Sequence, residues 1–98
     1  MMTVDQDTIY QYLDGRELLH TTLMEREQLL QELEKLVKAS QEMRCSEKVA
    51  RFPLMRAQTL LFELSVISEY IDSVIFEINC YAERCGKPRV QVIEMQLQ

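Results

Sequence analysis

The chain has 98 residues, of which 47% are hydrophobic and 28% are charged, and its formal net charge is −5. This length predicts one small domain over residues 1–98, and this composition excludes a disordered chain. The negative charge disfavours general binding to the phosphate backbone of nucleic acids, because that binding needs a basic surface.

Cysteine content and the distribution of charge bear on the cellular compartment. The three cysteines form no CxxC motif, and their odd number fits a reducing compartment better than a disulfide scaffold. The first residues, MMTVDQD, lack the apolar segment of a signal peptide. The acids that interrupt the apolar runs, and so exclude a membrane span, are Glu63, Glu69, Asp72 and Glu77. We therefore expect a soluble, cytoplasmic protein.

A first helix is expected over about residues 4–43. Thr3 and Gln6 have the spacing of a capping box. Asp14 and Gly15 leave open whether this helix continues or breaks, because glycine in a helix costs about 1 kcal/mol relative to alanine. The apolar residues spaced by three and four that we expect to pack are Leu19, Leu23, Leu30, Leu33 and Val37.

Two arginines, Arg16 and Arg26, fall in the same register as these leucines. A buried guanidinium group needs a carboxylate or carbonyl partner. Two interpretations remain open: both side chains reach solvent along their aliphatic stems, or one of them pairs with Glu63 or Glu77 and fixes the register of the helices.

The connector, residues 44–53, differs in charge from the rest of the chain. Residues 35–56 hold six bases and two acids, whereas residues 57–83 hold five acids and no base. Pro53 is well placed as the first residue of a following helix. The candidate basic patch, in which an aromatic ring stands among bases, is Arg44, Lys48, Arg51, Phe52 and Arg56.

A second helix is expected over about residues 54–85, closed by Gly86. Its packing stripe, which no charged residue interrupts, is Ala57, Leu60, Leu64, Ile67, Ile71, Val74, Ile78, Tyr81 and Cys85. At roughly 100° per residue, a second apolar set falls almost opposite, namely Met55, Phe62, Val66 and Cys80. A helix that is apolar on two opposed sides is buried on both.

These features predict an all-α fold, a long antiparallel helical hairpin that pairs with a second copy into a four-helix bundle. A lone hairpin would leave the second apolar set of its second helix in water. The residues expected at the dimer or partner interface are Met55, Leu60, Phe62, Leu64, Val66, Ile67, Ile71, Val74 and Ile78.

The tail, residues 86–98, begins with a helix stop at Gly86 and Pro88. Its apolar residues, which alternate with polar ones, are Val90, Val92, Ile93, Met95 and Leu97. This alternation predicts a short extended segment, with a disordered end or one more short helix as the alternatives. A lone strand is not stable in water. We therefore expect the tail to contact either the apolar groove of the dimer or the sheet edge of a partner.

Few residues have the pattern of a catalytic or metal site. His20 is the single histidine, and Cys80 and Cys85 diverge by roughly 140° around a helix. Glu69, Asp72 and Glu83 share a helix edge without a histidine partner, and Cys45 stands without a base. We therefore expect no enzyme activity, no cofactor, no metal and no small-molecule substrate.

The function that this pattern favours is a non-catalytic protein-interaction module: an adaptor, an assembly or secretion-type chaperone, or a small regulator. In architecture alone, the predicted hairpin is similar to small helical-hairpin dimers such as secretion chaperones and anti-assembly factors. Two alternatives remain open. One is an acidic inhibitor that imitates nucleic acid, and the other is a nucleic-acid binder that uses the basic connector.

Overall fold

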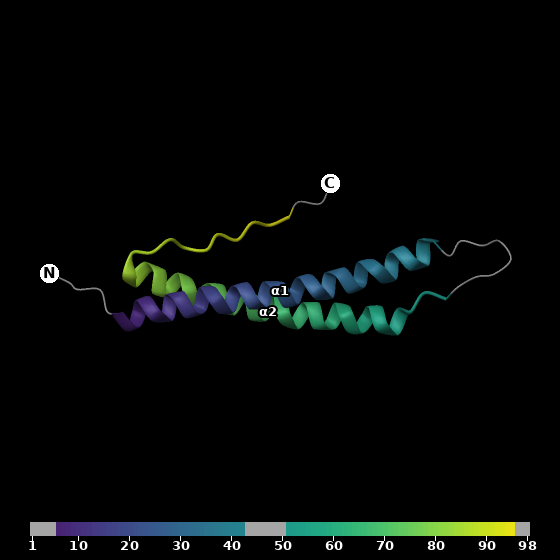
Figure 1. The fold of residues 1–98 in the computed structure, drawn as a ribbon, viewed down its shortest axis with the longest axis horizontal. Coiled ribbons are helices and arrows are strands. Elements are labelled where there is room, and N and C mark those ends of the chain that lie inside the picture. The colour runs from purple at the N-terminus through teal and green to yellow at the C-terminus, as the bar shows by residue number, and fades with distance from the viewer. Residues whose placement is uncertain (1–5, 43–50, 96–98) are drawn as a thin grey trace.

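The fold is a two-helix antiparallel hairpin. The computed structural model describes residues 6–42 and 51–95, which contain α1 (Gln6–Glu42) and α2 (Leu54–Cys85). The two helices lie side by side along nearly their whole length (Figure 1). The all-helical hairpin predicted from the sequence is therefore confirmed.

The helix α1 continues through Gly15 without a break. A Cβ atom at this position would lie 2.8 Å from Cγ1 of Ile78, which is closer than side chains pack. The missing side chain therefore allows α1 and α2 to approach each other here, and this gain offsets the low helix propensity of glycine. The expected cap at Thr3 lies outside the described residues.

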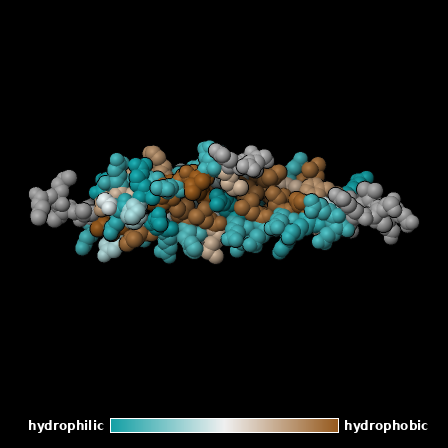
Figure 2. Space-filling model, turned by 90° about the horizontal axis from the view of Figure 1, so that it is seen from above, coloured by the Kyte–Doolittle hydropathy of each residue, from teal (hydrophilic) through white to brown (hydrophobic). Residues whose placement is uncertain are grey.

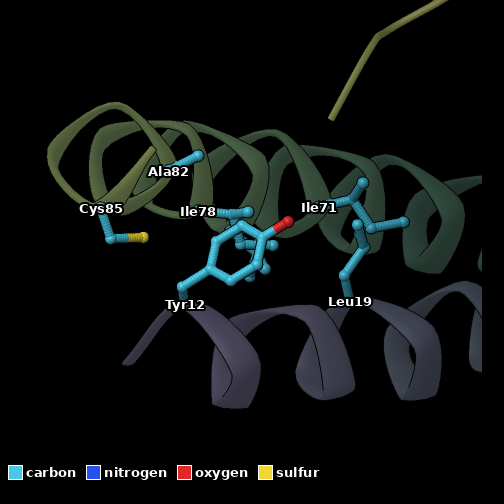
Figure 3. Close-up of a cluster of buried hydrophobic side chains, with 7 residues drawn as sticks. Tyr12, Leu19, Ile71, Ile78, Ala82 and Cys85 are labelled. Carbon is cyan, nitrogen blue, oxygen red and sulfur yellow. The ribbon is translucent and has the colours of Figure 1, made fainter. Parts of the chain in front are cut away.

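We call the residues through which each helix packs against the other its seam. The seam of α2 is the packing stripe that the sequence predicts. The buried residues of this helix are Ala57, Leu60, Ile71, Val74, Ile78, Ala82 and Cys85. Leu64, Ile67 and Tyr81 complete the stripe as half-buried side chains. Tyr12 and Leu19 of α1 belong to the same buried hydrophobic cluster as Ile78. Figure 3 shows these two side chains pointing toward α2.

In α1 the predicted residues Leu19, Leu23 and Leu33 pack against α2, but the prediction is wrong at Leu30 and Val37. Leu30 and Val37 are 48% and 41% exposed, whereas their neighbours Leu29 and Leu36 are half-buried. The residues that follow the observed heptad, counted in steps of four and three, are Thr8, Tyr12, Gly15, Leu19, Thr22, Arg26, Leu29, Leu33, Leu36 and Ser40.

Two hydroxyl groups in this seam are hydrogen-bonded within the helix. Thr22 is 3% exposed, and its hydroxyl donates a 2.7 Å hydrogen bond to the carbonyl of Leu18. Ser40 makes the same kind of bond to Leu36, at 2.9 Å. A hydroxyl that bonds to the preceding turn loses little on burial. Threonine and serine can therefore occupy seam positions that the hydrophobic pattern does not reveal.

Neither arginine of α1 takes the predicted acidic partner. Arg16 is exposed, and its guanidinium carbon lies 6.0 Å from the centroid of the Tyr12 ring. Arg26 is half-buried at a seam position. Within the described part of the chain, neither side chain forms an ion pair with Glu63 or Glu77. The interpretation in which the aliphatic stems reach along the helix surface fits this arrangement.

Proline and glycine define the two ends of α2. The helix begins at Leu54, so Pro53 directly precedes it rather than being its first residue as predicted. The Pro53 carbonyl accepts the first helical hydrogen bond, from the Ala57 N–H at 3.0 Å. At the other end Gly86 adopts a left-handed conformation, with φ 68°. The N–H of Lys87 then donates to the Ala82 carbonyl at 3.0 Å, which closes the helix and turns the chain back.

After this turn, residues 87–95 form neither helix nor strand. They run back over the hairpin toward its middle, as the yellow end of the trace in Figure 1 shows. Leu97, which the sequence analysis includes among the tail contacts, lies outside the described residues.

Candidate functional site

An open groove lies between the two helices, and we call it the Phe62 groove. It has a volume of about 580 Å³. Apolar side chains come from both helices: Leu29 of α1, and Phe62, Val66, Ile67 and Tyr70 of α2. The polar residues at its edges are Glu25, Gln28, Glu32 and Glu63. A groove of this size with an apolar lining is typical of sites that bind other molecules.

The second apolar set of α2 is exposed to solvent rather than buried in the seam. Met55 is 83% exposed, Phe62 70% and Val66 52%, and Cys80 is also exposed. Sequence reasoning missed Phe76, which is 71% exposed. It follows Phe62 by two heptads and therefore shares its side of the helix. We call Met55, Phe62, Val66, Phe76 and Cys80 the outer face of α2.

Other residues predicted at the interface are used inside the hairpin. Leu60, Ile71, Val74 and Ile78 are buried between α1 and α2 of one chain. Leu64 and Ile67 are half-buried along the same seam. The apolar surface that α2 offers to another molecule is therefore its outer face rather than its seam.

An ion pair between Arg56 and Glu32 connects the start of α2 with the edge of the Phe62 groove. The guanidinium of Arg56 donates two hydrogen bonds to Oε1 of Glu32, one of them from Nε at 3.0 Å. The hydrogen bond from Arg56 to Glu32 raises the pKa of the Arg56 guanidinium above its ordinary value. Both side chains are about half exposed, so this pair adds little to the free energy of unfolding. Its main effect is to hold the start of α2 beside α1.

The same ion pair affects the predicted basic patch. Arg44 and Lys48 lie outside the described residues. Arg51 and Phe52 are exposed, while Arg56 turns toward α1 and pairs with Glu32. One base of the patch thus pairs with an acidic residue of its own chain, which reduces the charge available for phosphate contacts.

A second site holds the start of the tail. The hydroxyl of Tyr12 donates to the Pro88 carbonyl at 2.8 Å. The side-chain amide of Asn79 bonds to both main-chain groups of Val90, at 2.7 Å and 3.1 Å. Sequence reasoning missed both roles. The signal was an asparagine inside an apolar helix segment, where its helix propensity is poor.

The remaining tail residues contact the hairpin less. Val90 packs against the core cluster, whereas Val92, Ile93 and Met95 are largely exposed. Figure 2 looks onto the face that carries the tail and shows brown side chains gathered along the middle of the molecule. The exposed apolar side chains of the tail therefore add to the apolar surface of this face.

The residues considered for chemistry lie apart. His20 and Cys80 are exposed, whereas Cys85 is buried in the core. Glu69, Asp72 and Glu83 are exposed on α2. Among the residues that the structure describes, no group of three or more histidine, cysteine or acidic side chains could hold a metal ion.

Comparison of the chain with protein-family models, with curated proteins and with solved structures finds no match. In residues 6–42 and 51–95, neither helix has a stretch that is long and apolar enough to cross a bilayer.

Proposed function

We propose that this chain is a non-catalytic protein-interaction module that acts in the cytoplasm as a helical homodimer. In this dimer two hairpins pair through the outer faces of their α2 helices and form a four-helix bundle. An adaptor, an assembly or secretion-type chaperone and a small regulator are the roles that such a dimer serves, with another protein as its partner.

The exposure of Phe62 is the observation that carries this proposal. A phenylalanine that is 70% exposed leaves most of a large apolar surface in water, and burying such a side chain is worth about 1.5–3 kcal/mol. Phe62 also has Val66 beside it and lines the same groove. Several large apolar side chains on one side of a helix indicate an interaction surface rather than scattered exposure.

A second copy is the occupant that we assign to this face. A two-helix hairpin buries only a narrow seam, and small domains commonly gain stability by association. A two-fold axis brings the same face of both chains together, so each apolar residue finds an apolar surface opposite. Four helices in a bundle then cover the outer face of α2 as well as its seam.

The proposal is tested with a charge placed on the outer face. We expect Phe62→Glu to weaken dimerisation by about 100-fold or more, because the change removes two buried rings per dimer and adds two acids. Ser68→Glu is the matched control. Ser68 is exposed on the same helix and lies roughly 120° from Phe62 around the axis.

Light scattering gives the mass of each variant, and circular dichroism gives its helicity. Loss of the dimer in Phe62→Glu with retained helicity, and an intact dimer in Ser68→Glu, supports the proposal. Dimers of equal strength in both variants would show that the outer face is not the interface. Phe62 is a cleaner test position than Ile67, because Ile67 packs against the core of its own hairpin.

A further inference from the structure

The start of the tail is held by side chains from both helices. Tyr12 of α1 donates its hydroxyl hydrogen to the carbonyl of Pro88, at 2.8 Å. Asn79 of α2 donates from Nδ2 to the Val90 carbonyl at 3.1 Å, and its Oδ1 accepts from the Val90 N–H at 2.7 Å. The two residues that hold the chain are 67 positions apart in the sequence and are brought together by the hairpin.

All three hydrogen bonds are made to main-chain atoms of the tail. An amide side chain that pairs with the N–H and the C=O of one residue offers the same donor and acceptor as a neighbouring β-strand. Such contacts do not depend on which side chains the bound segment carries. We call Tyr12 and Asn79, with the bonds they make, the tail clamp.

A groove beside the clamp, lined by apolar residues together with Arg26 and Asp72, supplies the side-chain contact. It has a volume of about 220 Å³ and lies between the hairpin and the tail. The hairpin residues that line it are Leu19, Leu23, Arg26, Ile71, Asp72 and Ile75, and residues 90–93 of the tail form its other wall. Val90 packs against this part of the core. Ile93, by contrast, borders the groove but is 85% exposed. The chain's own tail thus anchors one side chain firmly and leaves the groove incompletely filled.

We propose that the tail clamp and its groove form a binding site for an extended peptide segment of a protein partner, and that residues 88–90 occupy it as an internal competitor. The segment that fits has an extended main chain, a β-branched apolar residue at the position of Val90 and an apolar residue after it. This proposal rests on the proposed protein-interaction function and specifies a second surface for it, distinct from the outer face of α2.

Residues 88–90, the internal competitor, are bound weakly enough for a partner segment to displace them. Their contacts are three hydrogen bonds and one packed side chain, and each hydrogen bond contributes little net free energy because it replaces a bond to water. A partner segment that also fills the space beside Ile93 gains apolar contact that the tail lacks. Residues 91–95 are already exposed, so displacement would mainly free the Val90 side chain and its main-chain groups.

The test uses the full chain with Val90→Pro, which removes the N–H that Asn79 accepts from. Residue 90 lies outside both helices, so we expect unchanged helicity by circular dichroism. The probe is a labelled synthetic peptide with the sequence of residues 87–98, followed by fluorescence anisotropy. We expect the peptide to bind the Val90→Pro chain at least about tenfold more tightly than the unmodified chain, whose own tail competes.

Two further variants distinguish peptide binding at the tail clamp from unspecific binding of the peptide elsewhere on the hairpin. Adding Asn79→Ala to the Val90→Pro chain should weaken peptide binding about tenfold, because two main-chain hydrogen bonds are lost. Ser73→Ala, at an exposed position of the same helix, is the control and should leave binding unchanged. Equal binding to the Val90→Pro and unmodified chains, or binding that ignores Asn79→Ala, would overturn the proposal.

A double variant distinguishes failure of the clamp from failure of the dimer. Phe62→Glu combined with Val90→Pro is expected to be monomeric and still to bind the peptide. Loss of binding in this monomer would mean that a second copy completes the site, which contradicts a clamp within one chain. A chain that forms dimers but never binds the peptide refutes the clamp alone.

A measurement on the otherwise unmodified chain covers the case in which Val90→Pro fails to fold. With Asn79→Ala alone, hydrogen exchange at the Val90 amide should become faster, since its acceptor is gone. Exchange at the same rate as in the unmodified chain would show that the clamp does not hold the tail, and the proposal would be wrong.

Discussion

Gly15 and Gly86 are both required, for different physical reasons. Gly15 lies opposite Ile78, where an added Cβ atom would be too close to that side chain. Gly86 has open space around it but adopts φ 68°, a conformation that costs other residues roughly 1–2 kcal/mol. Asparagine tolerates this conformation better than most residues, because its side chain bonds locally.

These two reasons predict different responses to substitution. Gly15→Ala should destabilise the hairpin by about 1 kcal/mol, because overpacking against Ile78 outweighs the gain in helix propensity. Gly86→Asn should cost less than Gly86→Ala, since only the backbone conformation matters there. Urea unfolding measures all three free energies. A stabilised Gly15→Ala chain would show that the helices do not approach closely at this point.

At the scale of the helices, the sequence predicted α2 far better than α1. The seam of α2 contains apolar residues at every step, so only one register fits. In α1, Leu29 and Leu30 are adjacent, as are Leu36 and Val37, and hydrophobicity alone does not choose between neighbours. The register of α1 depends on seam positions occupied by threonine, glycine and serine. These residues do not appear in the hydrophobic pattern of the sequence.

The observed register of α1 predicts unequal effects of one substitution at two neighbouring positions. Leu29→Ala should lower the free energy of unfolding by about 1–2 kcal/mol, because Leu29 is half-buried between the helices. Leu30→Ala should change it by less than about 0.5 kcal/mol, as exposed positions do. Both changes have the same effect on helix propensity.

Urea unfolding at one fixed protein concentration measures both variants of this pair. A larger loss for Leu30→Ala than for Leu29→Ala would support the register predicted from the sequence over the observed one. The comparison is best repeated in the Phe62→Glu background, in which we expect association to contribute nothing to the measured stability.

The candidate sites show the same limit of sequence reasoning. The outer face of α2 could be predicted, because its apolar residues recur on one side of a helix with known bounds. The tail clamp could not, because it depends on the distance between Tyr12 and Asn79 across the hairpin and on the turn at Gly86. Contacts of this kind follow from three-dimensional packing and leave no periodic pattern.

At the scale of the whole molecule, we propose that one hairpin is half of an assembly. The hairpin is long and thin, and its large apolar side chains on α2 point both into the seam and away from it. A seam between two helices leaves the outer face exposed whatever its length. Pairing of two copies is the smallest closed arrangement that covers this face.

Sedimentation equilibrium of the unmodified full chain tests this claim most directly. We predict a mass of twice the chain mass at micromolar protein concentration, with dissociation to the single chain only on strong dilution. The dimer should keep the helicity expected for α1 and α2 by circular dichroism. A single-chain mass that persists at the highest concentrations measured, with full helicity, would contradict the account.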